Sequence, residues 1–293
     1  MRTVPYENIG IFDLAPGFYV SGGDPMAAYD GDGASGRCDN HCVFCLQGKF
    51  VEGEGAPFPE TPTRPRVDIG NWEPTALPDL SGKVKALRKR YEQVAVFTNG
   101  RRLDAACSRS LAEAGAGEVV VSLHGPSPAV HDALTKVRGS FDEAVAGCRN
   151  FVAAAKGRSQ LGISLVSTHS NLPHLGAVLD LSVALGARVL YLSLIVPLGA
   201  AKRSVKKYGP SPAQAFAALA ALASERGGKS DIVVHLIHMP VCIAEAAYAR
   251  DVSVVLTPRR GAFDELLSPA WVGRCAACRW APWCEGMMEA YAS

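Results

Sequence analysis

Apolar and polar positions follow two different rhythms along the middle of the chain. Short runs rich in Val, Ile and Leu, such as Val119–Leu123, are apolar at nearly every position, which is typical of strands buried on both faces of a sheet. Longer segments with a helical pattern separate these runs. The predicted strands are Arg66–Gly70, Val94–Phe97, Glu118–Leu123, Gly162–Val166, Val189–Leu194 and Ile232–Leu236.

Predicted helices fill the gaps between these strands. Gly115, Gly157 and Gly186 follow helical stretches, where a glycine often ends a helix. Strands that alternate with helices predict an α/β fold, in which helices cover a sheet of parallel strands. The predicted helices are about Leu80–Tyr91, Asp104–Ala114, Phe141–Ala155, Leu172–Leu185 and Pro212–Ala223.

Length and charge narrow the class of protein. A chain of 293 residues can form one large α/β domain or a barrel with a small appendage. A net charge of +2 gives no reason to expect nucleic acid or an anionic membrane as a partner. One local run is basic and is interpreted as a solvated loop, with contact to a phosphate or an acidic partner as the alternative. This run consists of Lys202, Arg203, Lys206 and Lys207.

The chain is expected to be cytoplasmic, with no membrane contact. Met1 is followed by mixed polar and aromatic residues, unlike the apolar core of a signal peptide. No apolar run approaches the roughly 20 residues that a membrane-spanning helix needs. Disulfides are uncommon in the reducing cytosol, so metal binding is the leading interpretation of the clustered ones among the nine cysteines.

The first cysteine cluster is Cys38, Cys42 and Cys45, with the spacing C-x3-C-x2-C. Three thiolates on one short loop can hold three irons of a [4Fe–4S] cube and leave the fourth iron without a protein ligand. Structural zinc sites usually close four ligands by joining two cysteine pairs, which this loop alone does not do. An iron–sulfur cluster with one open iron is therefore the prediction, with zinc as the alternative.

This spacing, with an aromatic residue just before the third cysteine, resembles the signature of the radical S-adenosylmethionine (SAM) superfamily, and Phe44 occupies the aromatic position. The segment Gly70-Asn71-Trp72-Glu73-Pro74 resembles the Gly-Gly-Glu-Pro motif of the family, although Asn71 and Trp72 depart from the usual glycine pair. The motif implies backbone groups and a carboxylate for the SAM amino group. Further similarity lies in Thr98-Asn99-Gly100 and in a serine at the end of the next strand. The cofactor-binding residues that the resemblance implies are Phe44, Gly70, Asn71, Trp72, Glu73 and Ser122.

The resemblance also implies an architecture and a source of electrons. It implies a partial (β/α)6 barrel over residues 1–230, with a small cysteine-rich extension over residues 231–293. Cleavage of SAM needs one electron from outside, so a flavodoxin or a ferredoxin is the expected donor. Such a barrel places ligands at the carboxyl ends of its strands.

A second set of cysteines lies in the expected extension. Cys275, Cys278 and Cys284 have the spacing C-x2-C-x5-C, and Cys242 supplies a fourth thiolate. The spacing resembles the SPASM or twitch extensions of radical SAM enzymes, which bind auxiliary [4Fe–4S] clusters. One auxiliary cluster is the prediction; structural zinc is the alternative that the spacing leaves open.

The expected activity follows from the resemblance. A radical SAM enzyme cleaves SAM reductively to a 5′-deoxyadenosyl radical, which abstracts a hydrogen atom from the substrate. The auxiliary cluster favours a net oxidation or a cross-link. The region from His124 to Phe141 resembles relatives that modify peptides, which favours a peptide or protein substrate, in maturation or natural-product biosynthesis. A dehydrogenase of a small molecule, such as a sugar or aminoglycoside-like alcohol, is the alternative. A non-catalytic iron–sulfur or zinc binding module is the alternative of a different class.

Overall fold

The computed structural model describes 11–15, 18–21, 38–45, 66–70, 73–199, 201–225, 232–240, 254–257, 275, 277 and 288–291. Within these ranges, no helix is both long and apolar enough to cross a bilayer.

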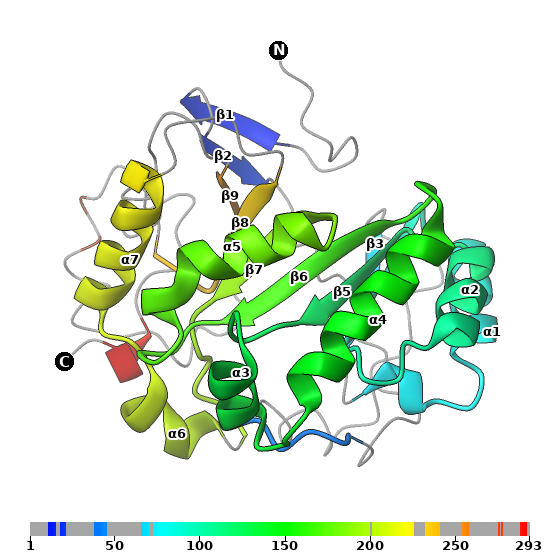
Figure 1. The fold of residues 1–293 in the computed structure, drawn as a ribbon. Helices are drawn as coiled ribbons and strands as arrows, with labels where there is room; N and C mark the ends of the chain where they lie inside the picture. The colour runs from blue at the N-terminus through cyan, green and yellow to red at the C-terminus, as the bar shows by residue number, and fades with distance from the viewer. Residues whose placement is uncertain are drawn as a thin grey trace.

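The sheet of the molecule contains six consecutive parallel strands that lie side by side in chain order (Figure 1). All six coincide with predicted strands to within three residues at each end. Both faces of each strand are covered, so most residues in these strands are apolar, and the apolar runs predicted them. The six strands are β3 (Arg66–Ile69), β4 (Gln93–Thr98), β5 (Glu118–Ser122), β6 (Gln160–Val166), β7 (Ala187–Ser193) and β8 (Val233–Ile237).

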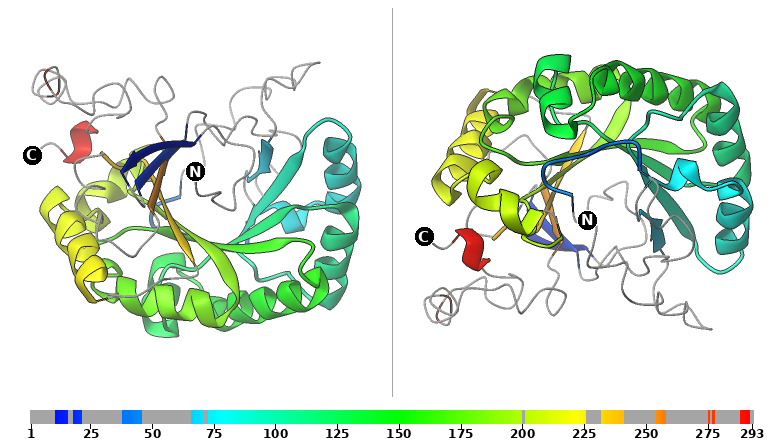
Figure 2. Two further views of the ribbon diagram at one scale, coloured as in Figure 1. Left: turned by 90° about the horizontal axis from the view of Figure 1, so that it is seen from above. Right: turned by 90° about the horizontal axis from the view of Figure 1, so that it is seen from below.

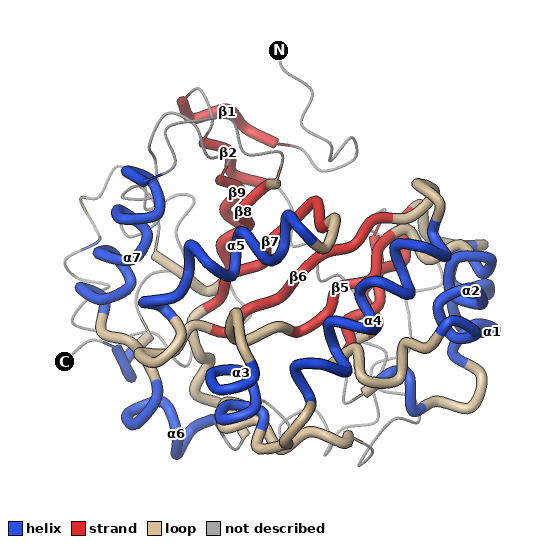
Figure 3. Tube along the Cα trace, in the orientation of Figure 1, coloured by secondary structure: helices blue, strands red, loops and turns tan. Residues whose placement is uncertain are grey.

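The sheet curls into a half-barrel, with helices along its convex side (Figures 2 and 3). Each parallel connection crosses over through helical chain, as the right-handed βαβ rule requires of strands in one sheet. The expected partial (β/α)6 architecture is therefore confirmed. The helices are α1 (Leu80–Arg88), α2 (Ala105–Ala114), α3 (Pro128–Thr135), α4 (Ser140–Ala155), α5 (Leu175–Ala184), α6 (Ala201–Tyr208) and α7 (Pro212–Glu225).

Three short strands extend the sheet beyond β8. Strand β9 (Val254–Thr257) pairs in parallel with β8, and β2 (Phe18–Ser21) pairs in parallel with β9. Strand β1 (Ile11–Ala15) runs antiparallel to β2 at the edge. The sheet thus continues past residue 230, where the cysteine-rich extension was expected to begin. The division of the chain at that residue stays a prediction.

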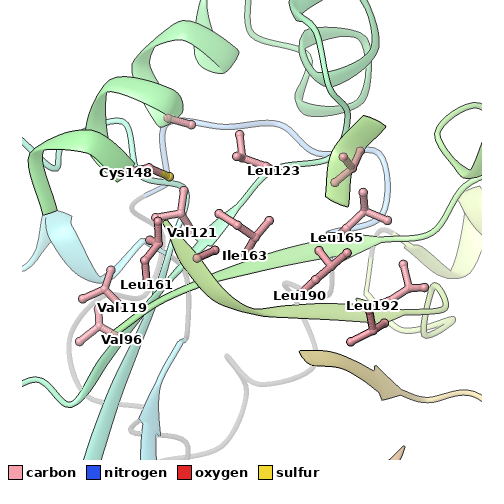
Figure 4. Packing of buried hydrophobic residues seen from close by; sticks show 14 of the residues in the cluster. Val96, Val119, Val121, Leu123, Cys148, Leu161, Ile163, Leu165, Leu190 and Leu192 are labelled. Carbon is pink, nitrogen blue, oxygen red and sulfur yellow. The ribbon is translucent and has the colours of Figure 1, made fainter. Parts of the chain in front are cut away.

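The main core lies between the convex face of the sheet and the helices (Figure 4). Val119 and Val121 of β5 point into it, whereas Val120 belongs to a separate cluster with Tyr191 and Val233. This alternation is the two-residue period of a strand, with both faces apolar. Phe151 of α4 is fully buried in the main core and is one of its largest side chains.

Several helix ends have the caps that their residues favour. The carboxylates of Asp79 and Asp104 accept hydrogen bonds from the amides of Gly82 and Cys107, at the starts of α1 and α2. Gly115 ends α2 with a φ of 89°, a conformation that strongly favours glycine.

Three helical segments differ from the sequence expectations. The basic run from Lys202 to Lys207 is not a loop but the body of α6, which buries Ala201 and Val205. Helix α3 was not predicted at all. The expected helix from Leu172 to Leu185 is a 3₁₀ turn, Leu172–His174, followed by α5. Pro173 within that turn fits the first turn of a helix, where its missing N–H costs nothing.

Gly147 of α4 should be intolerant of alanine. Replacing a glycine inside a helix with alanine ordinarily stabilises the helix, because alanine has the higher helix propensity. Here a Cβ at residue 147 would lie 2.2 Å from the carbonyl oxygen of Gly100. We expect Gly147→Ala to lower the free energy of unfolding by about 1–3 kcal/mol, the usual cost of overpacking. Urea denaturation would measure it, and an unchanged or raised midpoint would contradict the expected clash.

Candidate functional site

The loop 38–45 lies at the carboxyl ends of the strands and is held there by backbone hydrogen bonds. The amides of His41 and Val43 donate to the carbonyls of Thr135 and Leu134, at 2.9 and 3.0 Å, in the last turn of α3. The carbonyl of Cys45 accepts from the amide of Ala201, at 3.1 Å, where α6 begins. Two segments distant in sequence, the end of α3 and the start of α6, therefore fix the cysteine loop at the mouth of the half-barrel.

Aromatic rings pack beneath the loop. Phe44 is buried, and its ring meets the His124 ring edge to face, with centroids 4.6 Å apart. His124 stacks on His131, and His131 in turn meets Phe141 edge to face. The His131 Nδ1 accepts the backbone N–H of His124 at 3.0 Å, which fixes the neutral tautomer of His131 with its proton on Nε2.

Burial keeps both imidazoles uncharged at neutral pH. It lowers the pKa of His131 to about 4, with Asp132 opposing the shift. The pKa of His124 is also lowered well below its ordinary value, first by burial and then by the neighbouring His131. These rings therefore pack as apolar surface under the cysteine loop and add no charge beside it.

A polar cluster holds the other end of the loop. The Asp39 carboxylate accepts from the side-chain amide of Asn99 at 2.5 Å and from the Arg102 guanidinium at 2.9 Å. The Arg101 guanidinium donates to the backbone carbonyl of Asp39. Burial alone would raise the pKa of Asp39. The hydrogen bonds from Arg102 and Asn99 and the charge of Arg101 outweigh it and hold the pKa below its ordinary value.

Glu73 lies beside this cluster and joins the ends of β3 and β4. Its side chain is 1% exposed. Its Oε1 accepts from the Thr75 amide (3.0 Å) and from the hydroxyls of Thr75 (2.6 Å) and Thr98 (2.5 Å). Its Oε2 accepts from the backbone amide of Asn99 at 2.7 Å. Burial raises the pKa of Glu73 and these bonds oppose the rise. Oε1 thus takes three donors and Oε2 only one, so Oε2 is the oxygen with room for a further donor.

Asp132, in α3, fixes the turn that leads into α4. Its carboxylate accepts from the amides of Gly139 (2.7 Å) and Phe141 (2.9 Å) and from the Ser140 hydroxyl (2.9 Å). Since α3 ends in the carbonyls that hold His41 and Val43, Asp132 positions the cysteine loop indirectly. The three bonds outweigh the effect of burial, which alone would raise the pKa of Asp132, and hold this pKa below its ordinary value.

We expect Asp132→Asn to lower the free energy of unfolding by about 1–3 kcal/mol at pH 7, because an amide hydrogen would oppose one of the three donors. The pKa of Asp132 is lower in the folded protein than in the unfolded one. Its carboxylate therefore stabilises the fold above the unfolded pKa, near 4, and this contribution is lost as pH falls through the folded pKa. Urea midpoints of both proteins at pH 7 and pH 3 should converge at the lower pH. A pH-independent difference would contradict this account.

The three thiols of the loop lie close enough to influence one another. The pKa of Cys42 is raised to about 12, first by burial and then by Cys45 and Cys38. The pKa of Cys38 is also raised, first by burial, with the charge of Glu73 contributing. A cavity of about 360 Å³ borders Cys38 and is also lined by Asp39, Ala76 and Arg102. A site for a bound group thus opens between the cysteine loop and the segment after β3.

This donor set fits a [4Fe–4S] cube better than a single ion. In the part of the chain that the structure describes, no three His, Cys, Asp or Glu side chains converge as ligands of one metal ion. A cube takes each thiolate at a different iron, so its ligands surround a volume and need not point at one centre. Soft thiolate sulfur is the ligand type that such clusters select.

The remaining predicted site residues divide into two groups. Gly70 follows β3 directly, and Ser122 is the last residue of β5, so both lie at the carboxyl edge of the sheet. Cys275 is half-buried. The others fall outside the described residues, and their predicted roles stay predictions. They are Asn71, Trp72, Cys242, Cys278 and Cys284.

Sequence reasoning missed several residues that build the site. Asn99, Arg101 and Arg102 anchor Asp39 from the turn after β4, and Asp132 anchors α3. Asn99 was visible only as part of the Thr98-Asn99-Gly100 turn, and Asp132 only as part of the stretch from His131 to Phe141 that resembles relatives. A polar, charged segment directly after a buried strand was the signal available, since ligands gather at such strand ends.

Comparison with known proteins agrees with this geometry. Residues 34–171 match the family model described as the Radical SAM superfamily. The mycofactocin maturase MftC of Mycobacterium tuberculosis is 34% identical over 133 residues, covering 45% of this chain and 33% of the relative. The PqqA peptide cyclase of Ruegeria pomeroyi is 26% identical over 197 residues, covering 62% of this chain and 51% of the relative. The matches thus span a third to a half of the lengths of these curated relatives.

Solved structures agree on the fold. HydG, a maturase of the [FeFe]-hydrogenase, superposes with a TM-score of 0.56 over 79% of this chain and 56% of its own, at 12% identity. The residues that match the family model include the cysteine loop 38–45 and the strand ends beside it. Over residues 34–171 the chain is therefore similar in sequence to the radical SAM superfamily.

Proposed function

We propose that Cys38, Cys42 and Cys45 hold a [4Fe–4S] cluster at which SAM is reductively cleaved to a 5′-deoxyadenosyl radical, which abstracts a hydrogen atom from the substrate. The observation that carries this proposal is the three-thiol loop, fixed at the mouth of the half-barrel beside the buried carboxylate of Glu73. The open iron would take SAM in place of a fourth cysteine.

The surrounding residues would bind and orient SAM. The room left on Glu73 Oε2 suits an N–H of the SAM amino group, and the backbone of Gly70, Asn71 and Trp72 would supply further acceptors. Phe44 and Ser122 would border the nucleoside side of the site. The neutral, buried His124–His131 stack supports a dry floor, and exclusion of water protects a reactive radical from side reactions.

A peptide or protein is the proposed substrate, modified by oxidation or cross-linking. Two of the relatives described above, a mycofactocin maturase and a PqqA peptide cyclase, support this class of substrate. A small alcohol remains the second candidate substrate. The electron donor is proposed to be a flavodoxin or a ferredoxin, because the cleavage consumes one electron that the chain itself does not supply.

We also propose that residues 231–293 contain an auxiliary [4Fe–4S] cluster with Cys242, Cys275, Cys278 and Cys284 as ligands. The support is the spacing of these cysteines and the iron–sulfur chemistry of the same chain. Structural zinc at the same four residues is the competing assignment.

The test begins with anaerobic reconstitution of the wild-type protein, followed by iron, sulfide and zinc analysis. SAM should change the electron paramagnetic resonance (EPR) spectrum of the reduced cluster, and dithionite with SAM should yield 5′-deoxyadenosine. A candidate precursor peptide should raise this yield and gain a mass change. Zinc in the loop, or a cluster whose spectrum ignores SAM, would overturn the proposal in favour of a non-catalytic binding module. Yields that respond to an alcohol but to no peptide would overturn the substrate class.

A further inference from the structure

Helix α6 carries an unusual concentration of charge. Its eight residues include four cations and no acid, whereas the net charge of the whole chain is only +2. The four side chains are exposed, and the buried side of the helix is formed by Ala201 and Val205. The four cations, which together are named the α6 basic face, are Lys202, Arg203, Lys206 and Lys207.

No carboxylate within the described residues neutralises the α6 basic face. The ion pairs there involve Arg66, Arg101 and Arg102, and none reaches α6. Lys207 makes a cation–π contact with Tyr208, at 5.2 Å from the ring centroid, which leaves its charge intact. Four unneutralised cations on two helical turns produce a local field that extends about one Debye length, roughly 10 Å at 0.1 M salt.

The α6 basic face also lies next to the cluster loop. The first residue of α6 donates its amide to the carbonyl of Cys45, so one hydrogen bond joins the charged helix to a proposed iron ligand. Figure 1 shows α6 at the same end of the half-barrel as residues 38–45. A protein docked on this face would therefore come close to the edge of the cluster without entering the barrel.

We propose that the α6 basic face is the docking surface for an acidic electron-carrier protein, which delivers the single electron that the proposed function requires. In this step the reduced carrier loses one electron and the cluster held by Cys38, Cys42 and Cys45 gains it; no bond is formed or broken. Transient electron-transfer complexes are small and depend on charge complementarity for fast association, which suits a charged helix without an apolar pocket. A substrate must instead reach the interior of the barrel, where SAM would bind.

The test compares two reductants on the reconstituted enzyme. Lys202→Glu/Lys206→Glu reverses two charges of the face; Lys156→Glu/Arg158→Glu makes the matched change in the exposed turn before β6, at the opposite end of the strands. With reduced flavodoxin at low salt, the first variant should form 5′-deoxyadenosine about tenfold more slowly than the wild type, from lost electrostatic steering. With dithionite it should match the wild type, and the control variant should match it with both reductants.

Direct binding gives a second readout. Oxidised flavodoxin, titrated calorimetrically, should bind the wild type at low salt, bind it weakly at high salt, and bind the α6 variant weakly at both. Normal flavodoxin-driven turnover in the α6 variant would overturn this inference but not the proposed function. An equal loss of 5′-deoxyadenosine formation with dithionite would do the same. Lost binding of an acidic substrate peptide, with flavodoxin turnover intact, would reassign the face to the substrate. A wild type inactive with both reductants would instead overturn the proposed function.

Discussion

Cys42→Ser is expected to abolish formation of 5′-deoxyadenosine and to remove one [4Fe–4S] cluster from each chain. Cys42 is the middle cysteine of the loop, and its two neighbours, His41 and Val43, are both held by backbone hydrogen bonds to α3. Thiolates are the ligands that iron–sulfur clusters select, and a serine hydroxyl at this position is neither soft nor readily deprotonated. Iron and sulfide analysis after anaerobic reconstitution would measure the cluster, and chromatography of the quenched reaction would measure 5′-deoxyadenosine.

Two matched cysteine variants make this result specific. Cys107 lies on α2, outside the cysteine loop, so Cys107→Ala should keep both iron content and activity. Cys275→Ala should remove the proposed auxiliary cluster and leave the SAM-dependent EPR change in place. Full iron content and normal 5′-deoxyadenosine formation in Cys42→Ser would disprove the assignment of the loop.

The parallel strands were predictable because consecutive residues along most of them are apolar. In β5, Val119 and Val121 face the helices while Val120 faces the concave side, so every position had to be apolar. The same reasoning could not find β1, β2 and β9, which are four or five residues long. Strand β1 pairs only with its neighbour β2, and β2 joins the sheet through β9, where Phe18 pairs with Val254. Short strands such as β2 and β9 form because of a partner far away in the chain, which no local pattern records.

Helix α6 escaped prediction for a different reason. Only Ala201 and Val205 are buried in it, and four of its other six residues are cations, so its sequence is more typical of a solvated loop than of a helix. The contact that fixes its start is the bond from its first amide to Cys45, about 156 residues away in the chain, and such tertiary contacts routinely override local propensity.

The candidate site likewise has a part that local sequence predicts and a part that it does not. The spacing of Cys38, Cys42 and Cys45 is local and chemically specific, so it was readable from the sequence. The groups that orient this loop are not local: Asp39 is held by Asn99 and Arg102, from the turn after β4. Three-dimensional proximity at the carboxyl edge of a parallel sheet creates these pairs, and sequence order does not record which strand-end residues will meet.

A buried ion network crosses the concave side of the half-barrel. Arg66 of β3 pairs with Asp68 at 2.7 Å and with Glu118 of β5 at 2.8 Å, and the Tyr191 hydroxyl of β7 donates to Glu118 at 3.0 Å. Arg66, Asp68 and Glu118 are each less than 5% exposed. Burial raises the pKa of Glu118, and the charge of Arg66 opposes that rise. The guanidinium therefore compensates two carboxylates that water does not reach.

Arg66→Met is consequently expected to lower the free energy of unfolding by about 3–5 kcal/mol, because it leaves uncompensated charge in the interior. Arg66→Met/Glu118→Gln should recover part of this loss, since the neutral amide still accepts from Tyr191 and needs no cation. Arg109→Met, on the exposed side of α2, serves as the matched control and should cost about 0.5 kcal/mol or less. Urea denaturation of the three variants would measure these differences. A single variant as stable as the control, or a double variant less stable than Arg66→Met, would mean that the network does not depend on the arginine charge.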